Sequence, residues 1–124
     1  MFVDTNILLL WLLGDQKELS ARAEKLVLIA KPGSLLVTDI IVAEIVYVLR
    51  SNGRDRQQTS EALLLLGRTA PFKYENEELV IDIVRLLTDI KLDFADCYLL
   101  SRARRGGVGL ETFDEPLRKA CLSS

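Results

Sequence analysis

Two acidic residues directly follow apolar segments that are typical of β-strands. Asp4 comes after Phe2 and Val3, and Asp114 comes after the run 108–113 (VGLETF). In an open parallel sheet, ligands bind beyond the carboxyl ends of the strands. If both segments are strands of one such sheet, the two carboxylates project toward the same edge and can act on one ligand.

A third acid, Glu44, is the single charged residue between Ile40 and Leu49. The apolar content of this segment requires burial on most sides, and an isolated ionised carboxylate is costly to bury. A partner is therefore expected. Two kinds of partner remain open, namely an arginine in a salt bridge or a cation that Glu44 shares with other acids.

Asp93 and Asp96 lie three positions apart at the start of an expected helix, and so on one face of it. Taken alone, the pair is explained by capping, because Asp93 is a good N-cap and Asp96 complements the helix dipole. Together with the three acids above, the pair adds to a cluster of carboxylates that repel one another. A divalent ion that prefers oxygen ligands, such as Mg²⁺ or Mn²⁺, relieves this repulsion. The five acids therefore predict a cation site.

The chain contains no histidine. This excludes Ser-His-Asp and Cys-His triads, histidine-ligated zinc and RNA cleavage by paired histidines. Any hydrolytic chemistry must therefore depend on carboxylates, hydroxyls, lysines or a bound metal ion.

The elements that must position these acids follow from hydrophobic periodicity and from helix-stop signals. Strands are predicted at 2–4, 34–38, 71–74 and 108–113, with helices at 6–13, 17–30, 38–53, 59–66, 76–90 and 93–105. Asn6 is the expected N-cap of the first helix. The segment 38–53 is rich in β-branched residues, but its length and its end signals favour a helix. Strands separated by helices predict one α/β domain over residues 1–124, a parallel sheet with helices on both faces.

The composition is that of a compact globular protein, with 49% hydrophobic and 27% charged residues. The net charge of −2 gives no overall positive field that would favour nucleic acid. Cys97 and Cys121 have no metal or redox spacing and are interpreted as reduced thiols of a cytoplasmic protein. The apolar runs 7–13 and 40–49 are too short to span a bilayer, so no membrane association is expected.

Four stretches, which follow one another in the family's order, resemble the PIN-domain family, specifically the VapC-type ribonuclease toxins of toxin–antitoxin pairs. They are FVDTNILL, VTDIIVAEIVYVL, LDFADCYLLSRARRGG and LETFDEPL. The resemblance places the family's acidic cluster on Asp4, Glu44, Asp96 and Asp114, with Asp93 as an auxiliary acid. It matches Thr5, Asn6 and Thr112 to polar positions that support the acids or the metal-bound water. Glu111 departs from the family pattern, which more often has an apolar residue there.

The resemblance also implies a fold, an activity and partners. The fold is a central parallel sheet sandwiched by helices, commonly assembled as a homodimer. The activity is hydrolysis of RNA phosphodiesters with Mg²⁺ or Mn²⁺, in which the metal lowers the pKa of a bound water and stabilises charge on the phosphate. The implied partners are an RNA substrate and a cognate antitoxin protein.

Five arginines are candidates for phosphate contact. Each one singly is also explained as surface charge or as complementation of a helix C-terminus. They are Arg54, Arg56, Arg102, Arg104 and Arg105.

Three other functions compete with a nuclease. In a haloacid-dehalogenase-like phosphatase, Asp4 would be a phosphorylated nucleophile, but a second acid is needed where Asn6 stands. A phosphoacceptor receiver module needs an acidic pair after the first strand, and no acid follows Asp4 before Asp15. An interaction protein with a degenerate site is the third alternative, and the acids at all matched positions argue against it.

Overall fold

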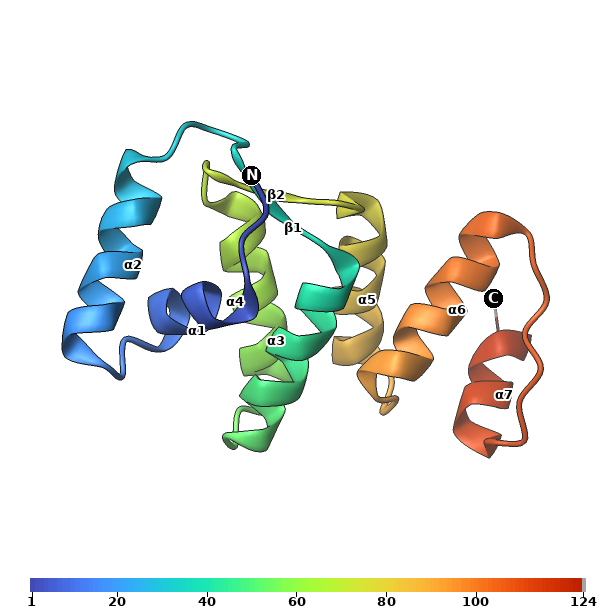
Figure 1. The fold of residues 1–124 in the computed structure, drawn as a ribbon. Helices are drawn as coiled ribbons and strands as arrows, with labels where there is room; N and C mark the ends of the chain where they lie inside the picture. Colours follow the sequence, from blue (N-terminus) through green and yellow to red (C-terminus); the bar gives the residue numbers. More distant parts are fainter. Residues whose placement is uncertain (124) are drawn as a thin grey trace.

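Figure 1 shows the computed structural model of the chain, in which residues 1–123 are described. The described chain is a helix-rich α/β domain, which confirms the predicted fold class. Its elements are α1 (Thr5–Leu13), α2 (Lys17–Ile29), β1 (Leu35–Val37), α3 (Asp39–Ser51), α4 (Arg56–Arg68), β2 (Phe72–Tyr74), α5 (Glu77–Asp89), α6 (Phe94–Gly106) and α7 (Glu115–Leu122).

The sheet is small and parallel. β1 pairs with β2 in a register that places Leu35 opposite Phe72. The N-terminal segment adds a single bridge, in which Phe2 lies opposite Leu36. The Leu36 amide donates to the Met1 carbonyl at 2.8 Å, and the Val3 amide donates to the Leu36 carbonyl at 3.3 Å. The first predicted strand therefore exists only as this bridge.

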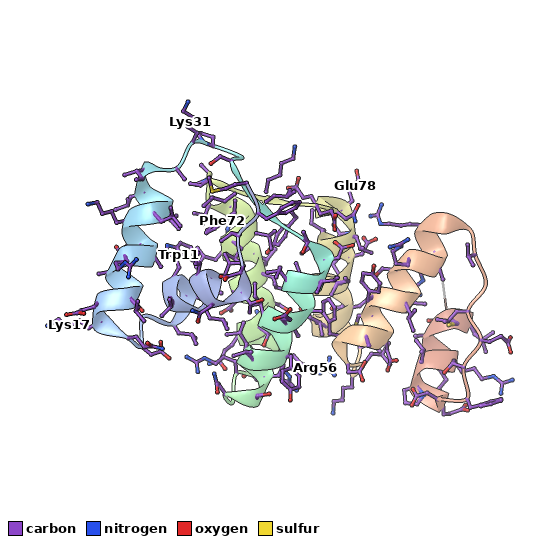
Figure 2. All side chains as sticks on the ribbon, viewed as in Figure 1. Trp11, Lys17, Lys31, Arg56, Phe72 and Glu78 are labelled. Atoms are coloured by element: carbon purple, nitrogen blue, oxygen red, sulfur yellow. The ribbon has the colours of Figure 1, made fainter. Side chains whose placement is uncertain are left out.

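The core lies where the central helices meet the sheet. α4 and α5 both pack against β2 and against each other. Tyr74 is buried at the end of β2, and its hydroxyl donates to the carbonyl of Leu63 on α4 at 2.6 Å. At the start of the same strand, the rings of Trp11 and Phe72 meet edge to face with centroids 5.2 Å apart (Figure 2). This contact fixes α1 against the sheet.

Most helices begin at a residue whose side chain caps them. The Thr38 hydroxyl accepts from the Ile41 amide, which confirms the helical interpretation of the β-branched segment. α4 begins earlier than predicted because Asp55 and Gln58 form a capping box. α1 begins at Thr5, and its N-cap is Asp4 rather than the expected Asn6.

The fourth predicted strand, at 108–113, is not formed. The chain leaves α6 at Gly107, which adopts the left-handed conformation with φ of 63°, and then runs extended beside α6 and α7 (Figure 1). The segment has strand-type residues, but within the described chain no strand edge lies next to it. Asp114 consequently follows a loop and caps α7, a helix that the sequence analysis did not predict.

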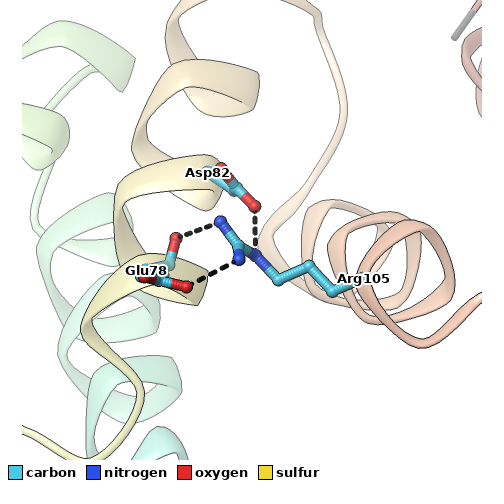
Figure 3. Close-up of polar contacts among 3 residues, drawn as sticks. All are labelled: Glu78, Asp82 and Arg105. Atoms are coloured by element: carbon cyan, nitrogen blue, oxygen red, sulfur yellow. Dashed lines mark hydrogen bonds and ion pairs between the residues drawn. The ribbon is translucent and has the colours of Figure 1, made fainter.

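Polar contacts from two consecutive arginines hold α6 in place. Arg105 donates to Glu78 at 3.0 Å and to Asp82 at 2.5 Å, both on α5 (Figure 3). Arg104 donates to the carbonyl of Ala120 on α7 at 2.9 Å. The loop 107–114 and α7 therefore depend on α6 for their position. No helix in the described part of the chain is long and apolar enough to cross a membrane.

Candidate active site

Three of the predicted site residues are helix N-caps. The carboxylates of Asp4, Asp93 and Asp114 accept from the amide three residues ahead, at 3.0, 2.9 and 3.1 Å. In each case one carboxylate oxygen makes this bond. Within residues 1–123 the other oxygen of Asp4 and of Asp114 has no hydrogen-bond partner, whereas Asp93 also shares a side-chain hydrogen bond with Asp96. Capping and a functional role are therefore compatible for Asp4 and Asp114, because each keeps an oxygen for a ligand.

Glu44 lies on the exposed face of α3, although the apolar sequence around it predicted burial. The helix turns Val42, Ile45 and Val46 toward the core, which leaves Glu44 on the opposite side. Its partner is the Thr5 hydroxyl, which donates to the carboxylate at 3.0 Å. Among the described residues, no arginine forms an ion pair with Glu44.

A second group of acids forms at the start of α6. Asp96 is half-buried, and its pKa is raised from the ordinary value, first by partial burial and then by the negative charges of Asp93 and Asp114. This effect shows that Asp114 lies close to Asp96, although the strand expected to carry it is missing. Like charges that oppose ionisation of one another attract a cation.

The five acids form two groups rather than one assembled metal-binding site. One group contains Asp4 and Glu44, linked through Thr5, and the other contains Asp93, Asp96 and Asp114. α3 and α6 pack against each other, so the two groups are carried by neighbouring helices. Within residues 1–123, however, no three of these side chains are arranged so that they could hold a metal ion.

The supporting polar residues differ in what they contact. The Thr112 hydroxyl accepts from the Asp114 amide at 3.0 Å and so orders the turn before α7. Asn6 is exposed in the first turn of α1, one residue beyond Thr5. Glu111 is exposed in the loop that replaces the fourth strand.

Four of the five candidate arginines make bonds that hold the chain together. Arg104 and Arg105 fix α6, as described above. Arg56 donates to the carbonyls of Leu87 and Ile90 at 3.2 and 3.1 Å, at the C-terminal end of α5. Arg54 donates to the Asn52 carbonyl. The fifth, Arg102, is exposed. It donates to the Tyr98 hydroxyl at 2.9 Å within α6, and its guanidinium lies 5.7 Å from the centroid of the Tyr98 ring.

Sequence reasoning did not single out two aromatic residues beside the acids. Tyr47 lies one turn after Glu44 on α3, and Phe94 directly follows Asp93. Both line a hollow between α3 and α6. The only signal in the sequence was their spacing from the acids, since aromatic residues in apolar helices usually belong to the core.

Comparison with known proteins gives one match. Residues 1–122 match the family model of the PIN domain, and no curated protein or solved structure matches the chain. PIN domains are generally nucleases that use divalent metal ions, and the acids described above are of the type such chemistry needs. The match covers nearly the whole chain, and this protein therefore belongs to the PIN-domain family.

Proposed function

We propose that this protein is a metal-dependent endoribonuclease and the toxin component of a type II toxin–antitoxin pair. The observation that supports the nuclease most strongly is the placement of Asp93, Asp96 and Asp114 around the start of α6, where partial burial and then the charges of the other two acids raise the pKa of Asp96. Asp93 and Asp114 stabilise the starts of α6 and α7 as N-caps, but the three carboxylates also repel one another. Their presence is explained if a cation or a substrate compensates the charge.

The residues fit a hard divalent ion by the chemistry of their donors. All are carboxylates, and the capping residues Asp4 and Asp114 each keep one oxygen that forms no hydrogen bond in residues 1–123. Asp4, Glu44, Asp96 and Asp114 are the proposed ligands, with Asp93 as an auxiliary ligand. Bound Mg²⁺ or Mn²⁺ would supply Lewis acidity toward the phosphate and toward the attacking water.

Hydrogen bonds within the chain orient the carboxylates proposed as ligands. The capping bonds of Asp4 and Asp114 fix one oxygen of each carboxylate and so aim the other. Thr5 holds Glu44 in the same way through its hydroxyl. One of these acids would also accept a proton from the attacking water.

The toxin role rests on the resemblance of this chain to VapC-type toxins. In such a pair the proposed homodimeric toxin is silenced by an antitoxin segment that lies over the two groups of acids. A basic side chain from that segment would pair with the carboxylates around Asp4 and Asp114 and exclude substrate or metal.

Purified protein incubated with RNA and Mg²⁺ or Mn²⁺ tests the nuclease. We expect cleavage by the wild type, loss of cleavage in Asp96→Asn, and cleavage by the matched variant Asp15→Asn, whose carboxylate lies in the exposed loop between α1 and α2. Unchanged cleavage by Asp96→Asn would exclude the proposed site.

Expression of wild type and Asp4→Asn in a bacterial host tests the toxin role. Growth arrest with discrete RNA cuts in the wild type alone supports it. Equal growth and intact RNA in both strains would contradict toxicity in that host.

A further inference from the structure

Arg56 is the first residue of α4, a position that local preferences do not favour for a cation. A positive charge in the first turn of a helix is opposed by the helix dipole. The acid at this end of α4, Asp55, is occupied as the N-cap, and among the described residues Arg56 forms no ion pair. The place of Arg56 is therefore explained by what it contacts beyond α4 and not by its own helix.

The contacts of Arg56 lie at the C-terminal end of α5. Its Nη1 atom donates to the carbonyls of Leu87 and Ile90, at 3.2 and 3.1 Å. The last turn of α5 has no basic residue of its own and ends on Asp89, so Arg56 supplies from α4 the cation that this helix end lacks. Because the donor is charged, these bonds are stronger than bonds between neutral groups.

The connection from α5 to α6 is short, and Arg56 holds its first residue. The carbonyl of Ile90 accepts from Arg56 and also from the Leu92 amide, the latter at 2.9 Å. Leu92 is buried, and Asp93 then caps α6. Figure 2 shows Arg56 at the end of the molecule where α5 finishes and α6 begins. Arg56 thus fixes the point from which the chain enters the start of α6, where the second group of acids lies.

Arg56 also lies between the two groups of acids. Together with Asp93 it lines the hollow of about 380 Å³ between α3 and α6. Burial raises the pKa of the Cys97 thiol, and the positive charge of Arg56 opposes this rise, so the guanidinium lies near the residue that follows Asp96. The other wall of the hollow is α3, which carries Glu44. A displacement of the start of α6 would therefore move its acids relative to Glu44.

We propose that Arg56 is a positioning residue for the cation site: its bonds to the end of α5 fix the start of α6 and so hold Asp93 and Asp96 where they bind the metal ion. The proposal rests on the metal-dependent function proposed above. It gives Arg56 a role that acts through the backbone of α5 and not through contact with phosphate.

Other roles for Arg56 predict different results. An arginine that only contacts RNA phosphate would affect RNA binding but not metal affinity. A cation that acts only by its charge would repel the metal ion, so its removal would strengthen metal binding. An arginine that only stabilises the fold would lower the unfolding free energy alone. A positioning residue is the one whose loss weakens metal binding in the absence of RNA.

Titration of the metal-free protein with Mn²⁺, without RNA and well below the melting temperature, tests the proposal. Arg56→Met keeps the apolar stem but removes the donors and the charge. We expect its Mn²⁺ affinity to fall about tenfold, at the lower end of the losses found when a residue that orients metal ligands is removed. Arg56→Lys should restore most of the affinity, because an ammonium group can donate to both carbonyls as Nη1 does.

Ser60→Ala is the matched control for stability. The Thr88 hydroxyl of α5 donates to the Ser60 hydroxyl of α4 at 3.2 Å, so this variant also loses a polar link between the two helices, within the helices and not at the connection to α6. It should lower the unfolding free energy and leave Mn²⁺ affinity unchanged. If Arg56→Met does not fold, Arg56→Gln, which loses the charge and the reach of the guanidinium, is titrated in its place with the same expected loss.

Two results would overturn the role of Arg56 and leave the nuclease intact. One is a wild-type protein that binds Mn²⁺ and cuts RNA, with Arg56→Met binding Mn²⁺ as tightly as Ser60→Ala does. The other is tighter Mn²⁺ binding by Arg56→Met, which the lost charge alone would explain. Wild-type protein that neither binds Mn²⁺ nor cuts RNA would overturn both the proposed function and the role of Arg56.

Discussion

The hydroxyl of Thr5 donates a hydrogen bond to the carboxylate of Glu44 at 3.0 Å, across 39 positions of sequence. It joins the first turn of α1 to α3 and so fixes Glu44 relative to Asp4, the residue before Thr5. The predicted cation site thus has one internal link that does not depend on a metal. This link can be removed without disturbing either helix.

Replacement of Thr5 by valine should reduce RNA cleavage while the fold persists. The shape of the side chain is kept, but the donor to Glu44 is lost, so the carboxylate is free to adopt other rotamers. The bond is exposed, and its loss should cost less than about 1 kcal/mol of unfolding free energy. Cleavage rates and denaturant unfolding of Thr5→Val and Thr5→Ser provide the comparison, since serine retains the hydroxyl. A Thr5→Val protein that cuts RNA as fast as the wild type would show that the link has no functional role.

Millimolar Mn²⁺ should raise the melting temperature of the wild type, because a ligand that binds only the folded state stabilises it by mass action. Asp96→Asn should abolish most of this rise. Without metal, the asparagine variant should be at least as stable as the wild type, because the charge of Asp96 is opposed by partial burial and by the charges of Asp93 and Asp114. Thermal melts with and without Mn²⁺, with Asp15→Asn as the control, measure both effects. Identical melting curves with and without Mn²⁺ in the wild type would argue against a cation site.

The local part of the fold was predictable because its signals lie in neighbouring residues. Thr38 and Gly107 mark helix ends through their own conformational preferences, and the structure places helix boundaries at both. The absence of the predicted strand at 108–113 could not be foreseen in the same way. A strand needs a partner edge, and the alternation of residue types cannot say whether one is available.

The local placement of some candidate acids was predictable, but their overall arrangement was not, and their role as a site stays a prediction. The spacing of Asp93 and Asp96 correctly indicated a shared helix start, and Asp114 lies near them. The exposure of Glu44 was missed because a helix can bury an apolar stripe and leave its one charge on the other face. The gap between the two acidic groups depends on how α3 and α6 pack, which is a property of the whole core.

The amides of residues 109–113 should exchange rapidly with solvent deuterium. None of them donates to a backbone acceptor within the described chain, whereas the amides of α5 lie in a helix that is largely buried. Exchange follows local opening, so unbonded amides exchange close to their intrinsic rates. Hydrogen exchange followed by mass spectrometry or NMR distinguishes the two segments. Protection of 109–113 comparable to that of α5 would mean that this segment pairs as a strand in solution, as its sequence suggests.

The unfolding free energy should fall as the pH rises above about 10. Burial raises the pKa of Tyr74 well above its ordinary value of 10.0, and its hydroxyl donates to the Leu63 carbonyl at 2.6 Å. In the unfolded chain the phenol loses its proton near pH 10, while the folded protein still retains it. Stability from this group is therefore complete below pH 10 and decreases above it, by at most about 1.4 kcal/mol for each pH unit.

Tyr74→Phe isolates this contribution, because the ring is kept and the ionisable hydroxyl is removed. Near neutral pH the variant should lose about 1 kcal/mol, since the Leu63 carbonyl loses a hydrogen bond. Between pH 9 and pH 11 its unfolding free energy should fall less steeply than that of the wild type, in roughly the range set by the ordinary phenol pKa. Urea unfolding at fixed pH values measures both slopes. Parallel slopes in the two proteins would mean that Tyr74 ionises as easily in the folded state as in the unfolded chain, and that its burial does not hold the proton.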